Sequence, residues 1–371
     1  MVLFPPSTCP RLIVKVGSAL LVDEAGSVRT EWLAGLVGEI ADRMAVGQQI
    51  AVVSSGAIAL GARRLALAKG GRASLEDAQA AAAVGQIALS QTWASLLGAE
   101  GLTAAQMLVT LDDLEDRRRY LNASATLDRL LSLKVVPIIN ENDSVATAEI
   151  RFGDNDRLAA RVGQAAAAQG VVLLSDVDGL YDRNPALPGA THIAEVERID
   201  ATIEAMADSG SGSGMGSGGM VSKLAAAKIA CGAGVALAIA SGRVERPLAL
   251  SALTSARHTL FLPEKRARAR KAWLAGRLTA RGSIIVDAGA AAALIEGKSL
   301  LAAGAIAVQG VFFRGDPVTI EGPAGPIARG LSEYDAIDAQ RLLGKRSDEH
   351  GAILGYAPRS ALVHRDHLVL L

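Results

Sequence analysis

The sequence is poor in aromatic residues, in cysteine and in net charge. Phe, Trp and Tyr make up 3% of its 371 residues, and 38 basic side chains balance 38 acidic ones. Balanced charge argues against a protein whose whole surface binds nucleic acid or an anionic membrane. Cys9 and Cys231 lie far apart without a C-x-x-C pattern, which argues against a disulfide framework and a zinc site. We therefore expect a cytoplasmic protein.

Long apolar segments and metal-ligand clusters are also lacking. Residues 1–10 have neither the basic segment nor the apolar core of a signal peptide. The apolar runs at 80–89 and 235–240 are shorter than the roughly 20 residues that span a bilayer. His364 and His367 are the only close pair of histidines, and no third ligand candidate lies nearby, so no protein-held metal site is predicted.

What the chain does have is apolar residues in two alternating patterns. They form 50% of the sequence, which excludes a disordered chain, and the length favours two domains. Short β-branched runs alternate with alanine- and leucine-rich segments of helical period, as in a parallel sheet covered by helices. The predicted strands are residues 12–16, 50–54, 135–139, 171–174 and 235–240, and the predicted helices are residues 30–46, 75–97, 117–133, 156–168 and 222–231.

The pattern changes after about Leu262. A basic run at 265–271 is followed by short strand-like pieces at 283–286, 305–313 and 317–320, separated by Gly and Pro. We expect a first domain over residues 1–262, a linker over 263–280 and a small β-rich domain over 281–371. Residues 276–371 contain ten basic and ten acidic side chains, so nothing in their net charge favours nucleic acid.

Polar residues that follow the predicted strands are the candidate site, because ligands of such sheets bind beyond the carboxyl ends of the strands. Lys15 with Gly17 and Ser18 ends the first strand, where a lysine supplies positive charge but could also be a solvated edge residue. Ser55 and Gly56 follow the second strand at the start of a helix, a place that suits a bound anion or an ordinary N-cap.

An acidic and amide cluster follows the strand at 135–139. Residues 140–143 read NEND and residues 153–156 read GDND. So many carboxylates in two short loops favour cationic partners, namely a substrate ammonium, lysines or Mg²⁺. Turn and N-cap chemistry would explain only one of the acids.

The glycine-rich segment 210–223 ends in Lys223 at the start of an apolar helix. Free N–H groups, a helix N-terminus and a lysine together form a phosphate cradle, although a flexible linker remains the alternative. A dinucleotide-like Gly pattern at 214–219 has no strand directly before it, and a Walker-like string at 292–299 lacks its first glycine, so both are weak matches. Two lysines, a phosphate cradle and an acidic cluster predict phosphoryl transfer, with an ionised acceptor that needs no general base.

These strings resemble those of the glutamate 5-kinases, a branch of the amino-acid kinase family, almost from end to end. The strings are VKVGS (14–18), VSSGAIA (53–59), AVGQ (83–86), PIINEND (137–143), GDND (153–156), LSD (174–176), GLY (179–181) and GSGGMVSK (216–223). The resemblance implies a three-layer αβα sandwich with a mostly parallel central sheet. Residues near 352–366 resemble the PUA domain that follows the kinase domain in many such enzymes.

The resemblance also implies the reaction of ATP and L-glutamate, with Mg²⁺, to L-glutamyl 5-phosphate in proline biosynthesis. By the same resemblance, Lys15 and Lys223 stabilise the transferring phosphoryl group and Asp156 holds them. The glutamate site would comprise Ser55, Asn140, Asp143, Asp154 and Asn155. The nucleotide site would comprise Lys15, Ser175, Asp176, Ser217, Gly218, Gly219, Met220, Val221, Ser222 and Lys223.

Further expectations from the resemblance are a homotetramer and feedback inhibition by proline. Ser217 replaces the usual threonine, and His258 replaces a common glycine, but no charged group of the mechanism is lost. Two alternatives stay open at this point. One is another amino-acid kinase, acting on acetylglutamate or aspartate, and the other is RNA binding through the PUA domain.

Overall fold

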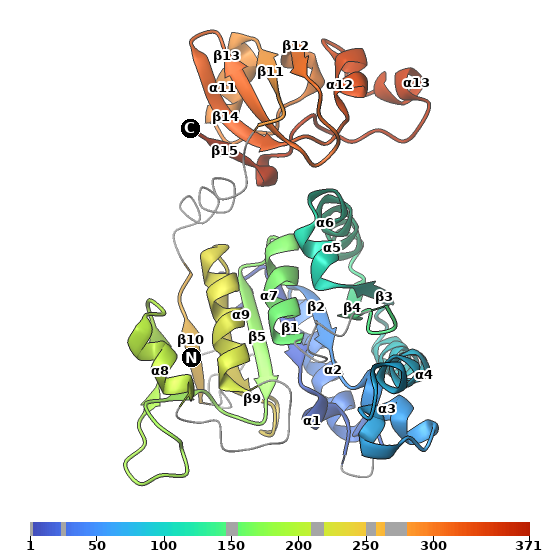
Figure 1. Ribbon diagram of the computed structural model, residues 1–371, viewed down its shortest axis with the longest axis vertical. Coiled ribbons are helices and arrows are strands. Elements are labelled where there is room, and N and C mark those ends of the chain that lie inside the picture. Colours follow the sequence, from blue (N-terminus) through green and yellow to red (C-terminus); the bar gives the residue numbers. More distant parts are fainter. Residues whose placement is uncertain (1–2, 24–26, 146–154, 209–218, 250–256, 264–279) are drawn as a thin grey trace. The chain divides into compact units, whose positions relative to one another are not determined.

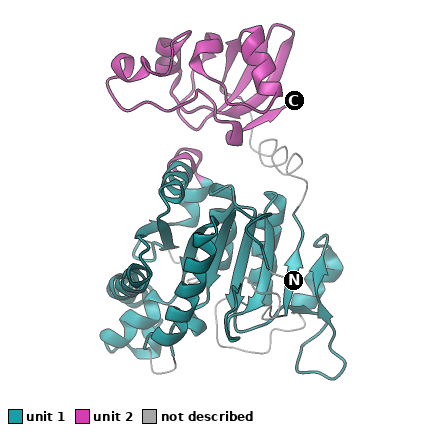
Figure 2. Cartoon of the chain, turned by 180° about the vertical axis from the view of Figure 1, so that it is seen from behind, with its two compact units in different colours: residues 1–115, 123–264 teal, residues 116–122, 265–371 magenta. Residues whose placement is uncertain are grey.

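The computed structural model describes residues 3–23, 27–145, 155–208, 219–249, 257–263 and 280–371. The chain divides into two compact units (Figure 2). The large unit comprises residues 1–115 and 123–264, and the small unit comprises residues 116–122 and 265–371. The predicted linker falls almost wholly outside the described residues.

An eight-stranded sheet forms the centre of the large unit, in the order β3-β4-β2-β1-β5-β9-β10-β8. Its strands are β1 (Arg11–Val16), β2 (Gln49–Ser54), β3 (Ala104–Val109), β4 (Val136–Glu141), β5 (Gly170–Ser175), β8 (Glu195–Val196), β9 (Ala236–Ser241) and β10 (His258–Phe261). All neighbouring strands from β3 to β9 pair in parallel, and β10 pairs with β9 in antiparallel fashion. The mostly parallel sheet is confirmed.

Helices cover both faces of this sheet. They are α1 (Ser18–Leu21), α2 (Thr30–Ala45), α3 (Ala57–Arg64), α4 (Leu75–Ala99), α5 (Leu111–Glu115), α6 (Arg117–Ser132), α7 (Asn155–Ala165), α8 (Ala201–Asp208) and α9 (Met220–Gly232), and a short ribbon pairs β6 (Leu180–Tyr181) with β7 (His192–Ile193). Leu12 and Val14 of β1 share a core with Leu36 of α2 and Trp93 of α4. On the other face, a methyl group at Gly163 of α7 would lie 2.7 Å from Val171 of β5. Figure 1 shows α7 and α9 on the near side of the sheet.

The predicted elements of the large unit all form, with ends displaced by at most three residues. Buried parallel strands are recognisable because both of their faces are apolar. Strand β3 is missed, because it is an edge strand with half-exposed residues and no β-branched run. Strands β8 and β10 are missed because they are very short.

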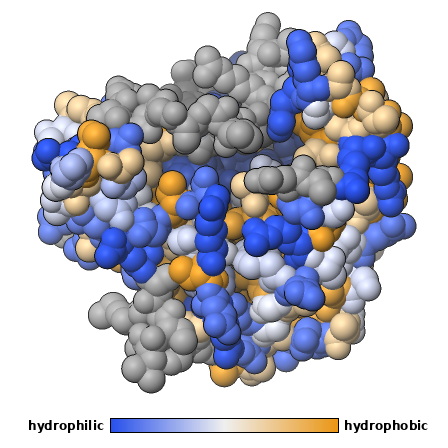
Figure 3. Space-filling model, turned by 90° about the horizontal axis from the view of Figure 1, so that it is seen from below, coloured by the Kyte–Doolittle hydropathy of each residue, from blue (hydrophilic) through white to orange (hydrophobic). Residues whose placement is uncertain are grey.

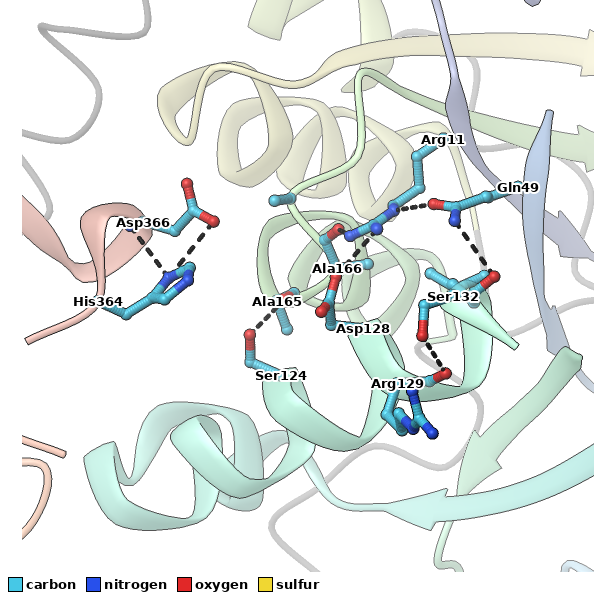
Figure 4. A network of polar contacts seen from close by, with 12 residues as sticks. Arg11, Gln49, Ser124, Asp128, Arg129, Ser132, Ala165, Ala166, His364 and Asp366 are labelled. Carbon is cyan, nitrogen blue, oxygen red and sulfur yellow. Dashed lines mark hydrogen bonds and ion pairs between the residues drawn. The ribbon is translucent and has the colours of Figure 1, made fainter. Parts of the chain in front are cut away.

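Arg11 fixes the amino ends of the strands. Its guanidinium donates to Gln49 Oε1 at 2.9 Å, to Asp128 Oδ1 at 3.0 Å and to the carbonyl oxygen of Ala166 (Figure 4). These partners belong to β2, to α6 and to the turn after α7. The first strand is thereby tied to its neighbour β2, to α6 and to the end of α7, at the edge of the sheet opposite the candidate site.

The small unit has its own five-stranded sheet, in the order β12-β11-β13-β14-β15. Its elements are β11 (Gly282–Val286), α11 (Ala288–Ile295), β12 (Ala305–Gly310), β13 (Pro317–Gly322), β14 (Gly325–Leu331), α12 (Ala336–Leu342), α13 (His350–Leu354) and β15 (Leu368–Leu370). A separate core forms around Ile284, Phe312 and Ile320. The predicted β-rich character is confirmed, while β14 is missed because proline and two glycines disguise its pattern.

Candidate active site

The carboxyl ends of the central parallel strands carry the polar residues singled out in the sequence. Strand β2 ends at Ser54 and is followed by Ser55, β4 ends at Glu141 just before Asp143, and β5 ends at Ser175. Figure 3 views the molecule from the side on which β5 ends in Figure 1. The described surface there carries many hydrophilic side chains, with smaller apolar patches between them.

Lys15, Asp156 and Lys223 come together in one buried group. Lys15 Nζ lies 2.6 Å from Asp156 Oδ1, and Lys223 Nζ lies 2.9 Å from Asp156 Oδ2. Their side chains are 8%, 1% and 4% exposed, so this is a buried ion triad. Strand β1, the first turn of α7 and the first turn of α9 each supply one member.

The charge balance of this triad leaves one positive charge over. Burial by itself raises the pKa of Asp156, but the two lysine ammonium groups outweigh that effect and lower the pKa to about 2. Asp156 therefore stays ionised, and it can neutralise only one of its two partners. The excess positive charge at this strand edge suits an anionic ligand such as a phosphate.

Gly17 leaves room beside Lys15. Its N–H donates to the carbonyl oxygen of Leu174 at 3.1 Å, which ties the end of β1 to β5. A methyl group on Gly17 would lie 3.3 Å from that oxygen and 3.8 Å from Lys15 Nζ. A side chain there would crowd the contact between β1 and β5 and would lie against the ammonium group of Lys15.

A second set of hydrogen-bonded polar groups surrounds Asn155, the residue directly before Asp156 of the triad. Its Nδ2 donates to Ser55 Oγ at 2.7 Å, to Asn140 Oδ1 at 3.0 Å and to the carbonyl oxygen of Ser54 at 3.2 Å. Asn140 and Asn155 are 2% and 4% exposed. Asn155 thus contacts two other residues of the predicted glutamate site, Ser55 and Asn140.

Asp143 lies beyond the end of β4 and is 8% exposed. Burial raises its pKa to about 6, and the positive charge of Arg72 opposes that shift. A pocket of about 420 Å³ is lined by Asp143, Asn142, Gln86 and Gln106, among others. A buried carboxylate that is costly to ionise alone is well suited to a cationic group of a ligand.

The predicted nucleotide residues are only partly visible. Ser175 Oγ donates to Asp176 Oδ1 at 3.0 Å at the end of β5, and Asp176 is exposed. Helix α9 begins after Gly219, whose position at the N-cap provides no side-chain hydrogen bond. The first N–H groups of the helix belong to Met220, Val221 and Ser222, and its fourth residue is Lys223. Asp154, Ser217 and Gly218 lie outside the described residues.

Sequence reasoning missed two features of the site. Gln86 of α4 accepts a hydrogen bond from Asn140 Nδ2 at 2.8 Å. Gly61 of α3 and Gly85 of α4 let the two helix backbones touch, because a methyl group at either would fall under 2 Å from a carbonyl oxygen of the other helix. The signal that would have indicated Gln86 is that it is the single glutamine inside the apolar run 80–89.

The described residues form no protein cage for a metal ion: in them, no three His, Cys, Asp or Glu side chains are grouped to bind one. Both oxygens of Asp156 already face lysines. Such a donor set fits a Mg²⁺ ion that is held mainly by the phosphates of a nucleotide, which is its usual manner of binding.

None of the described helices is both long and apolar enough to cross a membrane.

Comparisons with known proteins identify the family of the chain. The model of the amino acid kinase family matches residues 10–241, and that of the PUA domain matches residues 282–354. A solved UMP kinase from Bacillus anthracis aligns with 69% of this chain and 97% of its own, at a TM-score of 0.45 and 13% identity, too weakly to add to the assignment.

Three full-length relatives carry one and the same name. The chain is 73% identical to the glutamate 5-kinase of Sphingopyxis alaskensis, over 100% of both chains. It is 66% identical to that of Novosphingobium aromaticivorans, over 98% of this chain and 97% of the relative. It is 61% identical to that of Zymomonas mobilis, over 99% of this chain and 93% of the relative. The chain therefore belongs to the amino acid kinase family and, within it, to the glutamate 5-kinases.

Proposed function

We propose that the chain transfers the γ-phosphoryl group of ATP to the side-chain carboxylate of L-glutamate, giving L-glutamyl 5-phosphate and ADP, the first step of proline biosynthesis. The observation that carries this proposal is that Lys15 and Lys223 both contact Asp156, next to Asn155 with its contacts to Ser55 and Asn140. The match to glutamate 5-kinases along the whole chain argues against acetylglutamate or aspartate as the acceptor.

The chemical difficulty is to bring two anions together. The glutamate carboxylate is ionised at neutral pH, so one of its oxygens attacks the γ-phosphorus without a general base, while the bond from that phosphorus to the bridging oxygen of ADP breaks. Lys15 and Lys223 place positive charge where negative charge develops. Asp156 holds both ammonium groups in position, which avoids the cost of ordering them during the reaction.

Glutamate binds, in this proposal, to Ser55, Asn140, Asp143, Asp154 and Asn155. Asp143 faces the substrate ammonium, because a buried carboxylate with a raised pKa is stabilised by a cation. The amide group of Asn155 and the hydroxyl of Ser55 lie next to the triad and so can hold the substrate near the phosphoryl group.

ATP binds to Lys15, Ser175 and Asp176, and to the start of α9 with the segment before it, Ser217 to Lys223. The first N–H groups of α9 favour phosphate oxygens, as the positive end of a helix does. Mg²⁺, when bound to the nucleotide, would neutralise phosphate charge, and this chain's lysines add to that effect.

The remaining assignments also belong to the proposal. We assign the reaction to residues 1–262 and the PUA domain to residues 281–371, which the two family matches support. A homotetramer, feedback inhibition by proline and a cytoplasmic location complete it. Both cysteines are free and buried, which suits a reducing compartment.

The experiment that tests the function is trapping of the acyl phosphate with hydroxylamine. The purified chain is incubated with L-glutamate, ATP and Mg²⁺, and the hydroxamate and ADP are measured. N-acetyl-L-glutamate, which has no ammonium group for Asp143, is the control acceptor. We expect hydroxamate only with glutamate; equal or greater turnover of the acetylated acceptor, or none with glutamate, would contradict the proposal.

A further inference from the structure

A row of side-chain amides runs from α4 to the start of α7. Gln86 Oε1 accepts from Asn140 Nδ2 at 2.8 Å, and Asn140 Oδ1 accepts from Asn155 Nδ2 at 3.0 Å. At the other end, Gln86 Nε2 donates to Ser90 Oγ at 3.2 Å. The three amides are 8%, 2% and 4% exposed, so each is held inside the protein.

The main chain decides which way the amide of Asn155 faces. The carbonyl oxygen of Ser54 can only accept, so the group of Asn155 that faces it at 3.2 Å must be the NH₂. The same NH₂ faces Asn140 Oδ1, and the NH₂ of Asn140 therefore faces Gln86. Gln86 supplies the acceptor that makes this orientation of Asn140 favourable.

The orientation leaves the carbonyl oxygen of Asn155 available for a ligand. Asn155 Oδ1 is buried and has no hydrogen-bond partner among the described residues. A buried acceptor without a donor is costly, so a bound donor is expected. With both carboxylates ionised, the only hydrogen-bond donor of glutamate is its ammonium group.

We propose that Gln86 is a positioning residue of the glutamate site, which acts through Asn140 to hold the Asn155 carbonyl oxygen toward the substrate ammonium. Gln86 also lines the pocket of about 420 Å³ that contains Asp143, so one residue adjoins this pocket and is joined to Asn155 through Asn140. The inference rests on the proposed function, since it names glutamate as the ligand. Without Gln86, Asn140 loses a buried acceptor and its amide can turn, which removes one of the three acceptors that hold the NH₂ group of Asn155.

The test compares Gln86→Met with wild type in the full-length protein. We expect the KM for glutamate to rise on the order of tenfold, while the KM for ATP stays within about twofold, because a lost buried hydrogen bond has this effect on the ligand it orients. The matched control is Gln164→Met. Gln164 lies near the end of α7, is not among the residues that line the pocket that contains Asp143 and accepts from Arg161 at 3.4 Å, so its loss leaves the Asn140 contact intact and both KM values within about twofold.

A double-mutant cycle separates positioning from simple support of the fold. If Gln86 acts through Asn155, Gln86→Met adds little to the glutamate KM once Asn155→Ala is present. Additive effects on the glutamate KM, or an unchanged KM in Gln86→Met, would overturn the proposal. Should Gln86→Met fail to fold, Gln86→Ala, which is favourable in this alanine-rich helix, takes its place in the cycle.

Failure of this inference is distinguishable from failure of the proposed function. Wild-type protein that yields no glutamate hydroxamate would sink the function, whatever Gln86 does. An active wild type together with an unchanged glutamate KM in Gln86→Met would contradict only the positioning role of Gln86.

Discussion

At the scale of single residues, Asp156 controls the site because it is shared. One buried carboxylate faces two ammonium groups, so the protein keeps a positive charge at the strand edge without a bound anion. Lys15 and Lys223 are both buried, and the carboxylate of Asp156 between them reduces the repulsion of their two positive charges. The cost of burying the charges is offset only when all three are present.

Lys223→Met tests the role of the second lysine. Methionine keeps a similar length without the charge, so kcat should fall on the order of 10² or more through lost transition-state stabilisation. The control is Lys228→Met on the same helix, whose Nζ meets Glu204 at the surface at 2.7 Å. It should leave kcat within about twofold. A change confined to the KM of Lys223→Met would contradict the assigned role.

The raised pKa of Asp143 predicts a pH dependence. Burial shifts this pKa to about 6, so below pH 6 the carboxyl group is protonated in the free enzyme and can no longer attract the substrate ammonium. We expect kcat/KM for glutamate to fall about tenfold per pH unit below pH 6. Above pH 5 glutamate itself stays in one charge state, because its side-chain pKa is about 4.3.

Asp143→Asn is the control for this profile. It should raise the KM for glutamate and remove the acidic limb between pH 5 and 7, with the KM for ATP little changed. A mutant that retained the same limb would show that another group titrates. Steady-state rates of ADP release over this pH range provide the measurement.

At the scale of elements, the contact between α3 and α4 shapes the glutamate side of the site. A methyl group at Gly85 would lie 1.8 Å from the carbonyl oxygen of Ala57, the first residue of α3. That helix starts just after Ser55, through Gly56 in the left-handed region at φ 104°. Close packing at Gly85 therefore also sets the position of Ser55, and it brings Gln86 within reach of Asn140.

Gly85→Ala should separate the two helices. We expect a loss of unfolding free energy of about 1–3 kcal/mol from overpacking, together with a higher KM for glutamate. Gly98→Ala in the same helix is the matched control, since nothing lies within 4 Å of the added methyl group. That variant should gain up to about 1 kcal/mol from helix propensity. Thermal unfolding and glutamate KM are the measurements, and equal behaviour of the two variants would refute the packing argument.

Element identity followed from periodicity, but the contacts between elements did not. The glycines at 61 and 85 look like ordinary weak points of two helices in the sequence. Only the docked helices show that these positions are the place where two backbones touch. Likewise, Gln86 could be noticed as a polar residue in an apolar run, whereas its partner Asn140 lies 54 positions away in the chain.

At the scale of the whole molecule, the two units have separate cores. The core around Leu12 and Val52 belongs to the large unit, and the core around Ile284 and Phe312 belongs to the small unit. Every described residue of the candidate site lies in the large unit. We therefore expect the chemistry to require only the first part of the chain.

A chain that ends after Ala275 tests this division. We expect it to fold cooperatively and to release ADP in a glutamate-dependent reaction, with kcat within about tenfold of the full chain. Circular dichroism melting establishes folding before the assay. A folded but inactive protein would mean that the small unit completes the site.

The sequence by itself determined the α/β class, the positions of the main strands along the chain and the β-rich second domain, because these depend on local periodicity. It also placed the functional side chains at the carboxyl ends of strands, since ligands of parallel sheets bind there. The family resemblance implied that Asp156 holds Lys15 and Lys223, but the burial of this triad and the contact of Gln86 with Asn140 were decided by tertiary structure. Those contacts join segments far apart in the chain, and only the packing of α4, α7 and α9 on the sheet brings them together.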